Sequence, residues 1–224
     1  MNAELSQVGT EKITACQKCG ECCKRYAISV LPHELERQAK FFKLTPGQFT
    51  SIYTRLMVQL VPFTSGNHPL ALHSSMIPQE LWKKLQAAGF DKEYVMVLPM
   101  IGFKKQEYCV FFNPETFGCN MHAVKPLQCS LFPFASAQDN VDYSKAYDFC
   151  ELATITSPTK YTTAQQQLQR SAMKKYFDEV AEKGLNNVWH VLPQEGDVVF
   201  NNKKIAEITL AQLNEWLTWA GEGK

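Results

Sequence analysis

The stretch Cys16-Gln-Lys-Cys19-Gly20-Glu-Cys22-Cys23 governs how the rest of the sequence is interpreted, because it places four cysteines within eight residues. Two residues between cysteines let a tight turn direct two sulfurs at one ion, and Gly20 can adopt the positive φ that such a turn requires. Iron–sulfur clusters and structural zinc sites both use this spacing. Adjacent Cys22 and Cys23 have diverging side chains, so they suit two metals or one polynuclear cluster better than a single ion.

The other cysteines lie much farther apart. The 85 residues after Cys23 contain none, and later loops carry the rest. Eight thiolates suffice for two four-cysteine zinc ions or two cubane clusters of the 4Fe-4S type. Alternatively, four bind one cluster and the others are structural or redox-active. Buried free thiols and a metal-free redox dithiol are further interpretations, which the grouping disfavours. The predicted metal ligands are Cys16, Cys19, Cys22, Cys23, Cys109, Cys119, Cys129 and Cys150.

Composition narrows the class of protein. Of the 224 residues 45% are hydrophobic, enough to bury a core. The 23 basic and 22 acidic side chains nearly cancel, which argues against the basic face of a nucleic-acid-binding protein. The start has no apolar stretch of the signal-peptide type, and the longest nearly apolar run, Tyr94 to Phe103, has about half of the ~20 residues that a membrane span needs. We therefore expect a soluble, cytoplasmic protein without disulfides.

Helix and strand signals alternate in the first two thirds of the chain. Thr45-Pro46 is a helix start, and the helix should run to about Leu60. Pro78 to Ala88 resembles a second helix, closed by Gly89. The runs Tyr94 to Ile101 and Glu107 to Phe112 are typical of strands, and a turn follows over residues 113–118.

The C-terminal part is more regular. Its periodicity predicts a helix from Thr163 to Lys183, a β-hairpin over Asn201-Asn202, and a last short helix. The predicted fold class is therefore α+β, as a single domain over residues 1–224. Within it we expect a cysteine-rich metal-binding module with short strands and irregular loops, surrounded by helices. The module would be formed by residues 16–30 and 105–150, with a helical insertion at 31–104 and a helix–hairpin–helix at 160–220.

Two stretches, CQKCGECC and CVFFNPETFGCNMHAVKPLQCSLFPF, resemble the YkgJ-type cysteine-cluster family, whose members are described as zinc- or iron-chelating domains. The shared pattern continues after the first stretch with Cys109, Cys119, His122, Lys125-Pro126, Cys129 and Phe132-Pro133. The resemblance covers residues 16–30 and about 105–150, and it implies that the eight cysteines bind metal. Lys125 stands where arginine is commoner, which puts a bidentate anion contact there in doubt. Flagellin lysine methylases contain a similar cysteine group and an iron–sulfur cluster, which suggests cluster chemistry but not methylation.

Other residues near the cysteines have supporting roles in this interpretation. His122 could be a metal ligand, a proton donor or a loop histidine that donates to a sulfur, and we favour the last role because eight thiolates already suffice as ligands. Basic residues could offset a centre of net charge −2, or they form an ordinary solvated surface: Lys18, Lys24, Arg25 and Lys125. Aromatic residues could shield a cluster from water, or they are ordinary core: Tyr108, Phe111, Phe112, Phe117, Phe132 and Phe134.

The sequence thus predicts a metal-binding cysteine-cluster protein. Single thiolates reached from separate loops suit an iron–sulfur cluster slightly better than a zinc ion, and such a cluster would serve redox or modification chemistry. The alternative is a zinc-binding structural or interaction module without catalysis. No phosphate loop, dinucleotide fingerprint or nucleophile elbow assigns an enzymatic reaction. The partner would be a protein or a small molecule, not a membrane or a nucleic acid.

Overall fold

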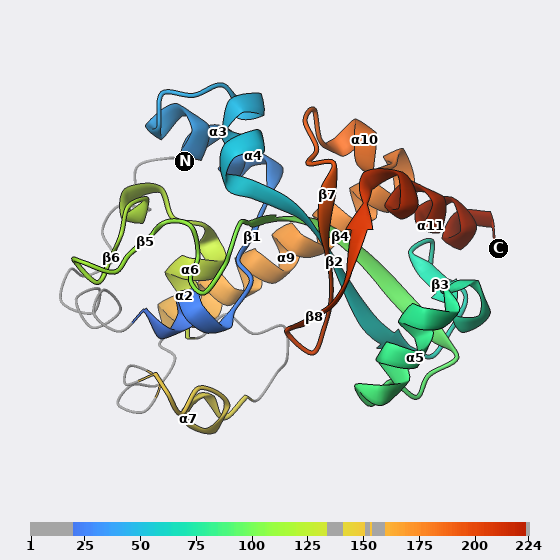
Figure 1. The fold of residues 1–224 in the computed structure, drawn as a ribbon. Coiled ribbons are helices and arrows are strands. Elements are labelled where there is room, and N and C mark those ends of the chain that lie inside the picture. The colour runs from blue at the N-terminus through green and yellow to red at the C-terminus, as the bar shows by residue number, and fades with distance from the viewer. Residues whose placement is uncertain (1–19, 134–140, 151–152, 154–159, 223–224) are drawn as a thin grey trace. The chain divides into compact units, whose positions relative to one another are not determined.

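The computed structural model describes residues 20–133, 141–150, 153 and 160–222 (Figure 1). By its internal contacts the chain divides into two compact units. Unit 1 comprises Met1–Ile28 and Lys105–Ser171, and unit 2 comprises Ser29–Lys104 and Ala172–Lys224. Residues 105–150 of the predicted cysteine-rich module, and all of its first segment except the last two residues, therefore fall in unit 1.

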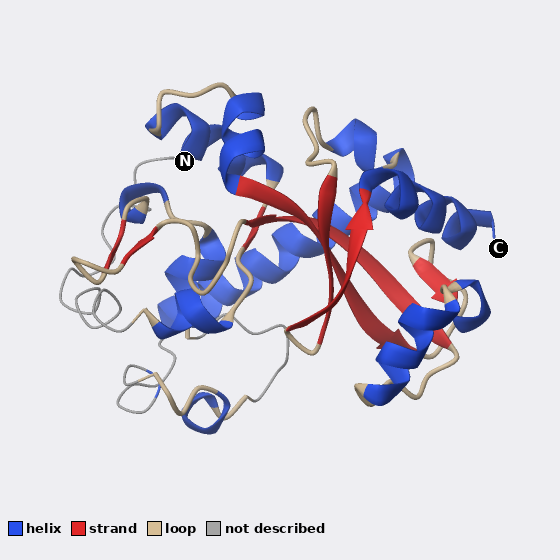
Figure 2. Cartoon of the chain, viewed as in Figure 1, coloured by secondary structure: helices blue, strands red, loops and turns tan. Residues whose placement is uncertain are grey.

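Unit 2 is built on a mixed β-sheet with the strand order β1-β4-β2-β7-β8, and β3 pairs with β4 beside this path. β2 and β4 pair antiparallel along their whole length, and β7 joins β2 in parallel. The sheet is drawn in red in Figure 2. Its strands are β1 (Ser29–Val30), β2 (Thr54–Phe63), β3 (Ala71–His73), β4 (Tyr94–Phe103), β7 (Glu195–Phe200) and β8 (Lys203–Thr209).

The centre of this sheet forms the core of unit 2. Leu56 of β2 lies opposite Ile101 of β4, and Leu60 lies opposite Val97. All four side chains are buried. Such cross-strand apolar pairs are the unit from which a sheet gains stability, so β2 and β4 form the rigid centre of this unit.

The helix that begins at Pro46 is shorter than the sequence predicts. The predicted N-cap is confirmed, because Thr45 Oγ1 accepts a hydrogen bond from Gln48 N at 3.2 Å. However, α4 ends at Tyr53 and the chain continues as β2, so the predicted extension of the helix to about Leu60 is wrong. Pairing of residues 54–63 with strands on both sides outweighs their helix propensity. The segment 31–104 therefore contains central strands as well as helices.

The remaining elements of unit 2 are helices, and two of these helices end just before a glycine with positive φ. α5 ends before Gly89, which has φ +90, and α9 ends before Gly184, which has φ +81. β7 and β8 meet over Asn201-Asn202, both at positive φ, so the predicted hairpin is confirmed. α11 contacts β3, β4 and β8. The helices are α3 (Pro32–Phe41), α4 (Pro46–Tyr53), α5 (Gln79–Ala87), α10 (Leu185–Val188) and α11 (Leu210–Glu222), while α9 (Lys160–Lys183) contributes residues to both units.

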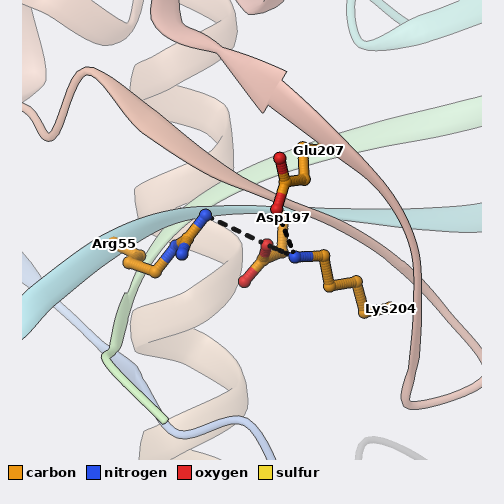
Figure 3. A network of polar contacts seen from close by, with 4 residues as sticks. All are labelled: Arg55, Asp197, Lys204 and Glu207. Atoms are coloured by element: carbon orange, nitrogen blue, oxygen red, sulfur yellow. Dashed lines mark hydrogen bonds and ion pairs between the residues drawn. The ribbon is translucent and has the colours of Figure 1, made fainter. Parts of the chain in front are cut away.

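Four charged side chains form a network across β2, β7 and β8 (Figure 3). Asp197 Oδ1 lies 3.3 Å from Arg55 Nη2 and 2.8 Å from Lys204 Nζ. Lys204 Nζ also lies 2.7 Å from Glu207 Oε1. The contact with Asp197, followed by that with Glu207, raises the pKa of Lys204. Because these side chains are partly exposed, the ion pairs contribute little stability, and their main effect is to link the edge strand β8 to β7 and β2.

Apart from the first half of α9, the elements described in unit 1 are short: α2 (Glu21–Arg25), β5 (Phe112–Asn113), β6 (Gly118–Cys119), the 3-10 helix η3 (His122–Val124), α6 (Leu127–Leu131) and α7 (Tyr143–Ala146). The turn predicted over residues 113–118 is confirmed as the connection between β5 and β6. The strand predicted at Glu107 to Phe112 is wrong. The chain there forms one isolated bridge, Lys105 to Cys109, because Cys109 N donates to Cys23 O instead of joining a ladder.

Helices and strands are both abundant, so the predicted α+β class is confirmed. Among the described helices, none combines the length and apolarity that crossing a lipid bilayer requires.

Candidate metal centre

The helix α2 positions the first described thiols. Gly20 precedes it with φ +66, so the positive φ expected at this glycine is confirmed. α2 carries Cys22 and Cys23, whose Sγ atoms lie 4.0 Å apart and whose side chains are half-buried. Cys16 and Cys19 lie outside the described residues, and their role as ligands stays a prediction.

An aromatic stack covers the backbone at Gly20. The rings of Tyr108 and Phe112 are stacked with centroids 4.6 Å apart. A Cβ atom on Gly20 would come within 2.5 Å of the Phe112 ring. Glycine is therefore required here both for its positive φ and for the close approach of the ring. The stack fixes the start of α2 against the segment that carries Cys109.

Three further cysteines arrive on separate short segments. Cys109 is buried in the loop before β5, and its N–H donates to Cys23 O at 2.9 Å. Cys119 ends β6 opposite Phe112. Cys129 lies in α6; the residue is half-exposed, but burial dominates the pKa of its thiol, which indicates that the sulfur faces the protein interior.

The thiols of Cys22, Cys109, Cys119 and Cys129 influence one another's charge, and we call them the four-thiol group. Burial raises the pKa of Cys129 well above its usual value, and the other three thiols add to this effect. Burial also raises the pKa of Cys109 to about 11 and that of Cys119 above its usual value. The hydrogen bond with Cys23, followed by burial, raises the pKa of Cys22. In the absence of a cation these thiols are therefore protonated at neutral pH.

Four aromatic rings pack together beside α2. Every pair among Tyr26, Phe132, Tyr147 and Phe149 has its ring centroids 5.2–6.3 Å apart. Tyr26 follows α2, Phe132 follows α6, and Phe149 precedes the buried Cys150. This aromatic cluster therefore joins three cysteine-bearing segments through contacts that need no metal. The inclusion of Cys150 among the ligands stays a prediction.

The aromatic residues predicted to shield the centre differ in how deeply they are buried and in what they contact. Phe111 is buried, and Phe132 belongs to the aromatic cluster. Phe117, at the end of the turn between β5 and β6, is 54% exposed and therefore gives little shielding. Phe134 lies outside the described residues. Sequence reasoning missed Tyr26, Tyr147 and Phe149, because ring contacts between distant segments leave no local spacing to detect.

The basic residues near the thiols differ in what they contact. Lys24 Nζ pairs with Glu107 Oε1 at 3.1 Å, and Arg25 Nε pairs with Glu21 Oε2 at 2.9 Å. By contrast, Lys125 acts on the thiols directly, since its charge opposes the rise in the pKa of Cys119 and Cys129. Lys18 lies outside the described residues.

Charges at the candidate centre act on two further side chains. Burial, followed by the charge of Lys125, lowers the pKa of His122, so this imidazole is neutral at physiological pH. Its role as a donor to sulfur stays a prediction. Lys105 is half-buried, and burial lowers the pKa of its ammonium, while the charges of Cys109 and Cys23 oppose that effect. No sequence pattern singles out Lys105, because its spacing from Cys109 matches no ligand motif.

The donor set fits a soft metal. Within the described part of the chain, no three His, Cys, Asp or Glu side chains are arranged to hold a metal ion. That part omits two of the four cysteines of the first stretch. Thiolates are the ligands that zinc and iron–sulfur clusters select. Buried thiols that disfavour one another's ionisation are stabilised as thiolates by a bound cation.

Comparison with known families gives an independent result. The model of a family described as "CxxCxxCC: Putative zinc- or iron-chelating domain" matches residues 15–151, more than half of the chain. This chain belongs to the CxxCxxCC family. The match contains all eight cysteines, so the resemblance seen in the sequence is confirmed, and CxxCxxCC membership supports binding of zinc or iron. It also runs through β2 and β4. Neither a curated protein nor a solved structure matches the chain.

Proposed function

We propose that this CxxCxxCC protein holds an iron–sulfur cluster through its cysteine thiolates. One observation carries the proposal: the four-thiol group draws its cysteines from four separate segments, and yet the thiols of Cys22, Cys109 and Cys119 all act on the charge of Cys129. Cys22, Cys109, Cys119 and Cys129 would be the principal ligands. Cys16, Cys19, Cys23 and Cys150 would complete this centre or a second one.

The origin of these thiols favours a cluster over a single ion. A structural zinc ion is usually closed by two tight cysteine pairs, each from one turn. Here each of Cys109, Cys119 and Cys129 is alone on its segment. A polynuclear cluster has irons several ångströms apart, so it accommodates single thiolates that arrive from different directions. The second sulfur of the adjacent pair on α2, 4.0 Å from the first, also suits a larger centre.

An iron–sulfur cluster supplies one-electron redox chemistry when it is bound. The chain's own residues would provide its environment. The buried side chains of Phe111, Met121 and Leu131 lie in the same unit and would exclude water. The redox or modification reaction would involve a protein or small-molecule partner in the cytoplasm.

The proposal is tested by metal analysis of the full chain purified without oxygen. We expect iron and acid-labile sulfide in whole-number ratio to the protein, together with visible absorption. Zinc at one or two ions per chain with no iron, even after anaerobic reconstitution with iron and sulfide, would reject the cluster and leave the zinc module.

A matched pair of variants tests the ligands. Cys129→Ser should lose most of the bound iron, because the serine hydroxyl is a poor ligand for a soft metal. Ser130→Ala, the next residue in α6, loses only a hydroxyl that donates to Pro126 O at 3.1 Å, and should keep the metal. Full iron content in Cys129→Ser would remove Cys129 from the ligand set.

The second candidate function is a zinc-binding interaction module without catalysis. It is favoured by the turn at Gly20, whose positive φ directly follows Cys19, as in the tight C-x2-C turns of zinc sites. The metal analysis above separates the two candidates.

A further inference from the structure

The basic side chains around the four-thiol group are not equivalent. Lys24 and Arg25 each have a carboxylate partner, Glu107 and Glu21. Both also lie over aromatic rings, Lys24 over Tyr108 and Arg25 over Phe149. Their charges are therefore largely balanced by groups other than the thiols.

Lys105 is placed differently. It forms an antiparallel bridge with Cys109. Residues directly opposite in such a bridge project their side chains to the same side, with Cβ atoms about 4.5–5.5 Å apart. The backbone of Cys109 is in turn held by Cys23 O at 2.9 Å. The bridge therefore holds the lysine stem beside a thiol of the group and close to a second cysteine.

The ammonium of Lys105 has no carboxylate partner among the residues that the structure describes. The side chain is half-buried, and no carboxylate in the described part of the chain forms an ion pair with it. Burial lowers the pKa of this ammonium, and the thiols of Cys109 and Cys23 are the acidic groups that oppose this effect. A partly buried ammonium is stabilised by an opposite charge nearby. Here that charge would be the negative charge of the metal-loaded thiolate centre.

From this geometry we infer that Lys105 is a positioning residue that supplies counter-charge to the metal centre and so raises its metal affinity. The inference rests on the proposed function, in that it requires a thiolate centre. Four thiolates around a divalent ion, or around an oxidised cubane cluster, carry a net charge of about −2. Lys105, beside Cys109, and Lys125, which acts on Cys119 and Cys129, together offer two positive charges.

A charge series at one position tests this role. The probe is Zn²⁺ alone, added to the reduced, metal-free full chain in competition with a chromophoric chelator. Lys105→Gln should weaken zinc binding about tenfold, equivalent to about 1.4 kcal/mol. Lys105→Glu, which reverses the charge, should weaken it about tenfold more. Lys105→Arg keeps the charge and should bind within about threefold of the wild type.

The control is Lys24→Gln, which removes the same charge from the same unit at a residue already paired with Glu107. It should bind zinc within about threefold of the wild type. Equal affinity across the Arg, Gln and Glu variants would overturn the inference, and so would an equal loss in Lys24→Gln, which would indicate a general effect of net charge. Failure of the wild type itself to bind zinc or iron would instead reject the proposed function.

Discussion

At Gly20, two requirements coincide in one residue, a left-handed backbone and an aromatic ring lying on the Cα atom. Gly20→Ala should therefore destabilise unit 1 by more than the ~1–2 kcal/mol that left-handed backbone alone costs a non-glycine residue. Denaturant unfolding and metal content of the variant would measure the effect.

Gly89 provides the matched control, since it has φ +90 but open space where a Cβ would lie. Gly89→Ala should show only the backbone cost. In a Phe112→Ala background, Gly20→Ala should cost less stability than it does in the wild type, because the ring that would clash is absent. Equal destabilisation by the two alanine substitutions would mean that the ring contact is unimportant.

The buried hydroxyl of Tyr176 couples the ionisation of this residue to the stability of unit 2. Its hydroxyl donates to Pro99 O at 2.8 Å and accepts from Trp189 Nε1 at 2.9 Å, and burial raises its pKa. Tyr176→Phe should lower the free energy of unfolding by about 1–3 kcal/mol near neutral pH, because two buried polar groups lose their partner.

The sign of the pH dependence follows from the raised pKa of Tyr176 in the folded state. An unfolded tyrosine ionises near pH 10, so above about that pH the unfolded chain releases a proton that the folded chain retains. The stability contributed by Tyr176 is complete below that pH and falls above it, by up to about 1.4 kcal/mol per pH unit. Urea unfolding at several pH values should show the gap between wild type and Tyr176→Phe narrowing above pH ~10. A constant gap would contradict this account.

At the scale of elements, β7 depends on a glycine for its place beside β2. Gly196 lies in register with Leu56, and a Cβ atom at Gly196 would overlap the Leu56 carbonyl group. Since backbone cannot move aside cheaply in a paired strand, Gly196→Ala should lower the free energy of unfolding by about 1–3 kcal/mol or more. Urea denaturation measures this directly.

Gly47 in α4 gives the opposite expectation. A Cβ there would meet a methyl group of Val191 at 3.8 Å, an ordinary contact. Gly47→Ala should therefore stabilise the protein by about 0.4–1 kcal/mol, through the lower entropy of the unfolded chain. If Gly196→Ala left the free energy of unfolding unchanged or raised it, the register of β7 against β2 would be in question.

The elements that could be predicted from the sequence are those fixed by local chemistry. Thr45 as an N-cap, Gly89 and Gly184 after helix ends, and the Asn201-Asn202 turn each act within a few residues. The end of α4 could not be found this way, because residues 54–63 become a strand only through partners about 40 and 140 residues later in the chain. The strand predicted at Glu107 to Phe112 is absent for a related reason: in the described residues only its last residue, Phe112, has a partner in a neighbouring strand, Cys119.

In the candidate site, too, local features could be predicted from the sequence and features that depend on distant contacts could not. Its cysteines were predictable, because their grouping is visible in the sequence alone. The placement of Lys105 beside Cys109 depends on a single bridge, and the aromatic cluster depends on contacts between Tyr26 and residues more than a hundred positions later. No local pattern records either.

At the scale of the whole molecule, the two units differ in how much apolar core they contain. The buried apolar residues described in unit 1 are few, among them Phe111, Met121 and Leu131, whereas unit 2 has a continuous sheet core. Coordination energy would then form a large part of the stability of unit 1, as in small metal-dependent domains.

Removal of the metal by chelation should therefore lower the melting temperature of unit 1 and leave unit 2 largely unchanged. Hydrogen exchange would locate the effect: amides in residues 105–131 should exchange faster without metal, while those of β2 and β4 keep their protection. An unchanged melting curve after verified metal loss would show that the aromatic cluster and the remaining core suffice.

The interleaved order of the two units has a consequence for synthesis on the ribosome. Cys16, Cys19, Cys22 and Cys23 emerge before the other cysteines, and 85 cysteine-free residues must be translated before Cys109 follows. At about 5–20 residues per second, this delay is on the order of 4–17 s. During that interval the nascent chain presents reduced sulfur without the segments that later bury it. A metal donor acting on the nascent chain would find only the first half of the ligands, so loading should follow release of the finished chain.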